Sequence, residues 1–250
     1  MTILEVQNLS QSYGGLHVLN NVSFSIQEGE RVGLIGPNGA GKTTLMNVLN
    51  GLLLPTAGRV SILGREVTRM SSHRRILLGL GRSFQLNMLF FNLSLLDNVL
   101  TAIFGTRTSR FQMFRPVSAY GDALNKVKEL LEPTGLWEKR NITVNELSYG
   151  EQRQVEVLLA LASKPKLFLL DEPSTGLTTG EISKLLNMIR ELTKDVTLFF
   201  VGHDMDLVFA LADRIMVLYY GQIIAQGTPK QIQSNPRVKE IYLGTGDKLA

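Results

Sequence analysis

The chain has no cysteine among its 250 residues, which excludes disulfides and thiolate metal sites. Charge of either sign is also scarce. Charged residues make up 19% of the chain, the net charge is +4, and the two signs are interspersed, so no nucleic-acid-binding tract is evident. No apolar run approaches the ~20 residues that span a bilayer. Glu5 lies where a signal peptide would have its apolar run. These absences predict a cytosolic chain, for which any membrane role must come through a partner.

The sequence does have enough apolar residues for one large core, at 44% of the chain. Residues 1–30 alternate in strand fashion, and 82–84 form a further short candidate strand. Strands buried on both faces, as a parallel sheet requires, are predicted at 31–35, 167–170, 196–201 and 215–219. Helices are predicted at 43–50, 180–192 and 205–212, and from Pro236 with Asn235 as its cap.

This pattern predicts an α/β fold with a mostly parallel sheet flanked by helices and an N-terminal antiparallel β portion. The pattern turns helical from about residue 86 to residue 163. We therefore expect a single domain with a nucleotide-binding core at 1–85 and 164–250. An inserted helical subdomain is expected at about 86–163.

Residues 36–43 match the phosphate-loop pattern G-x-x-x-x-G-K-[ST] at every required position. Such glycines let successive backbone N–H groups point at phosphate oxygens, next to the positive end of the following helix. Lys42 can reach the β- and γ-phosphates, and the Thr43 hydroxyl can ligate Mg²⁺. A chance glycine-rich turn is the alternative, but a strand before the loop and a helix after it favour nucleotide binding. The predicted binding residues are Gly36, Pro37, Asn38, Gly39, Ala40, Gly41, Lys42, Thr43 and Thr44.

Two carboxylates, Asp171 and Glu172, follow the apolar strand at 167–170. Ligands bind at the carboxyl edge of open α/β sheets, where this strand delivers them. Asp171 is the candidate Mg²⁺ ligand, and Glu172 can polarise the attacking water as a general base. An ordinary polar strand end is the alternative, and the phosphate loop upstream favours the functional interpretation.

The combination of these motifs with Leu147-Ser148-Tyr149-Gly150-Glu151 resembles the nucleotide-binding subunits of ABC transporters over nearly the whole chain. The family fold is a P-loop NTPase core with an inserted helical subdomain. The resemblance implies that Ser148 and Gly150 contact the γ-phosphate of ATP held by a second chain. Tyr149 and Glu151 depart from the family's L-S-G-G-Q pattern, and Glu151 puts an acid where a neutral amide is usual.

The resemblance assigns further residues in the expected order. Gln85 matches the residue that senses Mg²⁺ and the attacking water, and His203 matches the histidine that contacts the γ-phosphate. Tyr13 matches the aromatic that stacks on adenine, although a plain strand aromatic explains it nearly as well. Thr178 ends a loop where the family often has aspartate.

Three features resemble the ATP-binding subunits of importers for branched-chain amino acids and related amides: residues 79–85, 104–120 and 235–244. This implies an ATPase with ATP and Mg²⁺ as its cofactors. It also implies pairing with an identical or related ATPase, held at the cytoplasmic face of the membrane by separate permease subunits. A solute-binding protein would act indirectly, and nucleic acid is not expected as a partner. The alternatives are an ATPase of a lipid or lipopolysaccharide export system, and a soluble ABC ATPase that works away from membranes.

Overall fold

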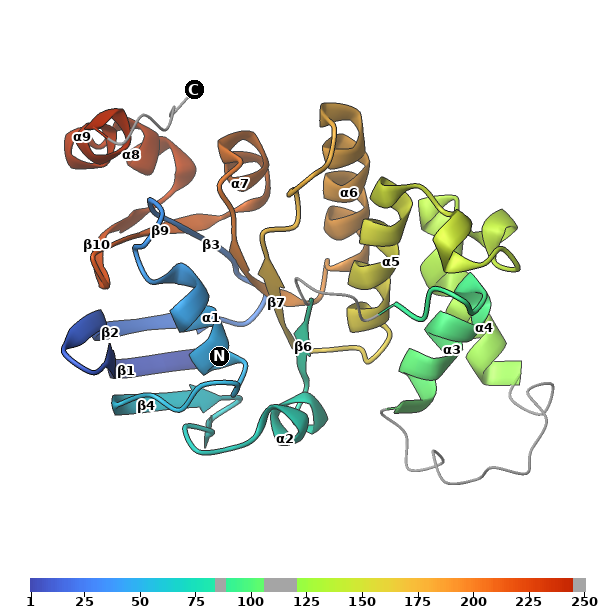
Figure 1. Cartoon of the computed structure of the whole chain (residues 1–250), viewed down its shortest axis with the longest axis horizontal. Helices are drawn as coiled ribbons and strands as arrows, with labels where there is room; N and C mark the ends of the chain where they lie inside the picture. Colours follow the sequence, from blue (N-terminus) through green and yellow to red (C-terminus); the bar gives the residue numbers. More distant parts are fainter. Residues whose placement is uncertain (84–88, 106–120, 245–250) are drawn as a thin grey trace. The chain divides into compact units, whose positions relative to one another are not determined.

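The computed structural model describes residues 1–83, 89–105 and 121–244. Its contacts divide the chain into two compact units. The first comprises Met1–Leu80, Lys166–Thr175 and Thr193–Ala250, and the second comprises Gly81–Pro165 and Gly176–Leu192 (Figure 1). Among the described residues, no helix combines the length and the hydropathy that crossing a membrane requires.

Two sheets form the framework of the first unit. The smaller is antiparallel, in the order β2 (Leu16–Gln27), β1 (Thr2–Tyr13), β4 (Ala57–Ile62) and β5 (Arg65–Glu66). The larger has the order β10 (Gln222–Gly227), β9 (Arg214–Tyr219), β3 (Arg31–Ile35), β8 (Thr197–Val201), β7 (Leu167–Asp171) and β6 (Leu80–Arg82). The predicted α/β fold with an antiparallel N-terminal portion is therefore confirmed.

The central strands of the larger sheet are parallel, and β10 pairs antiparallel with β9. Every residue of β8 is buried, as are the first four residues of β7. Strands covered on both faces need this unbroken apolar character, which is the signal that predicted them. Residue 84, the end of the candidate strand at 82–84, lies outside the described residues.

The first unit also contains five helices in its described part: α1 (Lys42–Leu49), α2 (Ser72–Leu77), α7 (Met205–Leu211), α8 (Pro229–Ser234) and α9 (Pro236–Gly244). Helix α9 begins at Pro236 as predicted. The Asn235 side-chain oxygen accepts from the backbone N–H groups of Arg237 and Val238, so the predicted cap is confirmed. Proline suits this first helical position because its missing N–H is one that the helix would leave unbonded.

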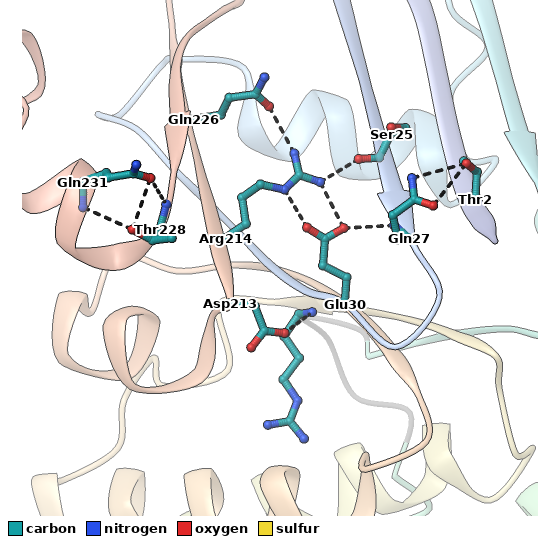
Figure 2. A network of polar contacts seen from close by, with 10 residues as sticks. Thr2, Ser25, Gln27, Glu30, Asp213, Arg214, Gln226, Thr228 and Gln231 are labelled. Atoms are coloured by element: carbon teal, nitrogen blue, oxygen red, sulfur yellow. Dashed lines mark hydrogen bonds and ion pairs between the residues drawn. The ribbon is translucent and has the colours of Figure 1, made fainter.

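Arg214, at the start of β9, joins three strands within the first unit (Figure 2). Its guanidinium binds both carboxylate oxygens of Glu30, at 2.6 and 3.1 Å. It also donates to the carbonyl of Ser25 in β2 and to the side chain of Gln226 in β10. Burial alone would raise the pKa of Glu30, but hydrogen bonds from Arg214 and from the Gln27 N–H outweigh it and lower the pKa overall.

We expect Arg214→Met to lower the free energy of unfolding at pH 7 by about 2–3 kcal/mol, because it removes charge-assisted bonds and leaves Glu30 half-buried without its cation. The pair's contribution is complete above the ordinary glutamate pKa of about 4.3 and is lost as pH falls through the lowered pKa of folded Glu30. Urea unfolding at pH 7 and at pH 3 measures both effects. Arg59→Met, at an exposed position of β4, is the matched control. An equal loss in both variants would contradict this role.

The second unit is helical in its described part, with α3 (Leu95–Gly105), α4 (Gly121–Leu131), α5 (Tyr149–Leu161) and α6 (Thr179–Leu192). Helix α5 contacts both α3 and α6. The core of the second unit includes Leu95, Val99, Val127 and Leu158, all fully buried. The sequence pattern assigned 180–192 to the core of the fold, whereas contacts group α6 with α5. The domain limits of 1–85, 86–163 and 164–250 stay a prediction.

Candidate active site

The carboxyl ends of three neighbouring strands meet at one edge of the larger sheet. β8 lies between β3 and β7 in parallel register, with Val201 opposite both Leu34 and Asp171. The segments that follow these strands therefore lie side by side: the loop from Gly36, the Asp171–Glu172 pair and His203. This is the edge at which open α/β sheets bind ligands.

The loop at 36–41 leaves β3 and enters α1, and two of its glycines, Gly36 and Gly41, have no room for a side chain. A Cβ at Gly36 would overlap the carbonyl oxygen of Leu218 in β9. Gly41 caps α1 in the left-handed region at φ 104°, and a Cβ there would lie 2.8 Å from the carbonyl oxygen of Val18. Both positions require glycine because the backbone is tightly held and curled. Such a curl turns N–H groups inward, as phosphate binding needs.

Lys42, the first residue of α1, folds back over the loop. Its ammonium donates to the carbonyl oxygens of Gly36 and Pro37 at 2.6 and 3.0 Å, and the residue is only 8% exposed. A buried cation held beside a glycine-rich loop at the start of a helix favours binding of a polyanion. Thr43, next along α1, is exposed, and Thr44 is half-buried.

Glu172 and His203 are brought together at the same edge, with 3.8 Å between His203 Nδ1 and Glu172 Oε2. The Glu172 N–H donates to the carbonyl of Val201, which fixes the carboxylate beside the end of β8. Asp204 caps α7 through the Leu207 N–H, so His203 lies just before the helix begins. Glu172 adopts a φ of 42°, which an L-residue rarely occupies, and such backbone conformations cluster at functional sites.

Mg²⁺ bound together with a nucleotide fits the side chains at this edge. Among the described residues, no group of three or more histidine and acidic side chains gathers as a metal site. Mg²⁺ bound with a nucleotide needs only one or two protein ligands, because phosphates and water supply the rest. Thr43 at the start of α1 and Asp171 at the end of β7 fit that need.

Two predicted residues are less well defined at this edge. Tyr13, the last residue of β1, has a 52% exposed ring. The hairpin that it precedes continues into Val18, which lies against Gly41, so the ring belongs to a segment that reaches the phosphate loop. Its contact with adenine stays a prediction. Gln85 lies outside the described residues.

Ser148 and Gly150 lie in the second unit, at the start of α5. Ser148 caps the helix: its hydroxyl oxygen accepts from the Glu151 N–H at 3.3 Å, and the Glu151 carboxylate accepts from the Ser148 N–H at 3.0 Å. Sequence reasoning noticed Glu151 as an anomaly and missed this capping box, although Ser-x-x-Glu is its signature.

Lys139 neutralises the unusual acid of this segment. Its ammonium lies 2.5 Å from the Glu151 carboxylate. Burial alone would raise the pKa of Glu151, but the bonds from Lys139 and Ser148 outweigh it and lower the pKa overall. Glu151 is therefore a paired carboxylate at neutral pH. No sequence motif pointed to Lys139.

The loop ending at Thr178 belongs to the same unit. Thr178 caps α6, and the Glu181 carboxylate accepts from the Thr178 N–H at 2.9 Å and from its hydroxyl at 2.8 Å. Thr178 therefore ends the loop and starts the helix, at the position where the family often has aspartate. The described structure thus gathers the predicted residues in two sets, one in each unit.

The sequence matches two family models. Residues 19–175 match the ABC transporter model, and 222–248 match the branched-chain amino acid ATP-binding cassette transporter model. The chain is 36% identical to the high-affinity branched-chain amino acid transport ATP-binding protein LivG of Salmonella typhimurium, over 97% of this chain and 98% of that one. It is 35% identical to the BraF protein of the same description in Pseudomonas aeruginosa, with the same coverage.

Solved structures agree with this match. An ATP-binding cassette of an ABC transporter superimposes with a TM-score of 0.85 at 31% identity, covering 97% of this chain and 99% of that one. A dimeric cassette bound to ADP and Pi in a post-hydrolysis state gives a TM-score of 0.77 at 25% identity, covering 91% and 99%. The phosphate loop, the carboxylate pair and these matches lead to one conclusion: the chain belongs to the ABC transporter family, as one of its ATP-binding cassettes.

Proposed function

We propose that this chain is the ATP-hydrolysing subunit of an importer for branched-chain amino acids. One observation carries the substrate class: the chain matches two such transport ATP-binding proteins over nearly their full length, at 35–36% identity. The family model at 222–248 independently carries the same description. An arginine transport ATP-binding protein, ArtM of Bacillus subtilis, is also 33% identical over 95% of this chain, so amino acids are the broader class.

The proposed reaction is phosphoryl transfer from ATP to water, catalysed by positioning and electrostatics. Lys42 leaves the carbonyl oxygens of Gly36 and Pro37 and takes phosphate oxygens in their place. Glu172 accepts a proton from the attacking water, and His203, 3.8 Å from that carboxylate, stabilises the γ-phosphate. Mg²⁺, when bound, neutralises phosphate charge, and Thr43, Asp171 and Gln85 are the residues proposed to hold it.

We propose that a second cassette, in solution a copy of this chain, completes each ATP site. A dimeric relative bound to ADP and Pi supports pairing. Ser148 and Gly150 of one chain then face the γ-phosphate held by the other. ATP binds the closed dimer more tightly than the open one, so its binding energy drives the conformational change that closes the dimer. That conformational change is transmitted to the permease subunits at the cytoplasmic face of the membrane. A solute-binding protein delivers the amino acid to the permease subunits.

An affinity pull-down of the tagged chain from native membranes in mild detergent tests this function. Recovery of multi-span permeases together with an amino-acid-binding protein that retains labelled leucine is the expected result. Recovery of lipid-export components would overturn the substrate class and leave the ATPase intact. A chain found only in the soluble fraction would contradict a transport role.

The ion pair between Lys139 and Glu151 gives a separate prediction. We expect Lys139→Met to weaken ATP-dependent dimer formation roughly 3- to 10-fold, because an unpaired carboxylate next to the γ-phosphate site repels it. Glu151→Gln keeps an oxygen for the capping box and removes the charge. The double variant, Lys139→Met with Glu151→Gln, should therefore recover ATP-dependent dimer formation. Sedimentation of the chain with MgATP measures the effect at about 50 mM and about 300 mM salt, below and above physiological ionic strength. A double variant as weak as Lys139→Met would contradict it.

A further inference from the structure

A glutamate of the same chain faces the N–H of Gly150. The Glu181 carboxylate lies against the backbone of Gly150, and the Gly150 N–H is among the groups that lower the pKa of that carboxylate. A Cβ at Gly150 would overlap the Oε1, Cδ and Cγ atoms of Glu181, so a larger residue cannot stand there without displacing that side chain. The absence of a side chain at Gly150 thus lets the Glu181 carboxylate approach the backbone at the start of α5 within a single chain.

The same carboxylate also holds the loop that ends at Thr178. Its Oε2 atom accepts from both the N–H and the hydroxyl of Thr178. These bonds, first from Thr178 and then from Gly150, hold the pKa of Glu181 below its usual range. Glu181 is therefore an anion at neutral pH that joins the start of α5 to the start of α6.

A second contact joins the same two segments. Gly176 has a φ of 79°, and a Cβ there would lie 2.9 Å from the Tyr149 ring. Tyr149, which departs from the family pattern, thus packs over the loop before α6. The helix that carries Ser148 and Gly150 is consequently tied to that loop by one apolar and one charged contact, and both lie within the second unit.

We propose that Glu181 is a positioning residue for dimer closure: its carboxylate occupies the N–H of Gly150 in the separate chain and releases it to the γ-phosphate of partner-bound ATP. The inference rests on the proposed function, in which Gly150 serves that phosphate. Two anions that accept from the same N–H group lie close enough to repel each other. The Glu181 side chain must therefore turn away as ATP arrives, which also loosens its bonds to Thr178. Nucleotide arrival is thereby coupled to the loop at 176–178.

The contact itself is tested in the separate chain by NMR. The sequence contains four Tyr–Gly peptide bonds, at Gly14, Gly121, Gly150 and Gly221. Labelling tyrosine carbonyl carbon and glycine nitrogen therefore selects four amide signals. In Glu181→Gln we expect one of the four to move upfield, because a charge-assisted hydrogen bond is weakened. Four unchanged signals would overturn the proposal.

Closure is tested in the Glu172→Gln background, which retains ATP. Glu181→Gln keeps an oxygen to cap α6 but loses the charge. We expect it to form the ATP dimer at a roughly 5- to 30-fold lower chain concentration, because a neutral acceptor competes less well for Gly150 and does not repel phosphate. Glu191→Gln, the same change on the exposed end of α6, should leave the concentration unchanged.

The outcomes separate the two claims. A parent variant that dimerises with ATP, with Glu181→Gln unchanged or weaker, overturns the role of Glu181 and leaves the proposed function standing. If the Glu172→Gln parent stays monomeric with ATP, the closure step is overturned both in the proposed function and in the role of Glu181. The NMR experiment still decides whether Glu181 holds Gly150. If Glu181→Asp forms the ATP dimer at the same chain concentration as the parent, the charge of residue 181, and not the shape of its side chain, sets that concentration.

Discussion

Glu172→Gln is expected to keep ATP binding and to lose hydrolysis by roughly 10²–10⁴-fold, the usual contribution of a general base. The amide has nearly the shape of the carboxylate and can accept hydrogen bonds, but it cannot take a proton from water. The carboxylate follows β7 at the sheet edge and lies 3.8 Å from His203, which places it at the edge where the phosphate loop leaves β3.

Phosphate release and nucleotide retention on the same sample separate the chemical step from binding. Glu66→Gln on β5, an exposed position of the other sheet, controls for the loss of a charge. Turnover at the wild-type rate would refute the role of Glu172. Loss of binding together with hydrolysis would mean that Glu172 holds the nucleotide rather than the water.

Lys42→Met is expected to lower hydrolysis by roughly 10²–10³-fold, the usual loss when one preorganised donor to a developing negative charge is removed. It should also weaken ATP binding, because the cation above the phosphate loop is gone. The ammonium now satisfies two carbonyl oxygens of the loop, so the variant should also lose about 1–3 kcal/mol of stability.

Binding of a fluorescent ATP analogue, phosphate release and thermal unfolding together test this prediction. Lys164→Met, at a turn beyond α5 in the second unit, is the control for the removal of a lysine. Turnover within threefold of wild type would contradict the assignment of Lys42. A variant that binds ATP normally but unfolds early would reduce Lys42 to a structural residue.

Short-range patterns predicted the sheet edge well. An apolar strand, a glycine-rich loop and a helix in direct succession specify a phosphate loop, because each element constrains its neighbour. The position of Asp171 after an apolar run likewise predicted a strand end. The parallel register that brings Asp171 and Leu34 to the same level of β8 could be expected only from the fold class.

Contacts between segments distant in the chain were harder to predict. Lys139 lies twelve residues before Glu151, outside its helix, and Glu181 faces Gly150 from another helix. Nothing in composition pairs such residues. Both acids did carry a local signal, since Ser148-x-x-Glu151 and Thr178-x-x-Glu181 are capping boxes that predict helix starts. The positive φ of Glu172 is set by surrounding structure and had no signal.

The central claim is that two cassettes share each ATP site, and the rate of phosphate release by the purified chain as a function of its concentration tests it most directly. Specific activity with MgATP is expected to rise with chain concentration and then saturate, because Ser148 and Gly150 of one chain complete the site of another. Added Glu172→Gln chains are expected to depress the wild-type rate. A specific activity that is constant at every concentration, or no hydrolysis at all, would contradict a shared ATP site.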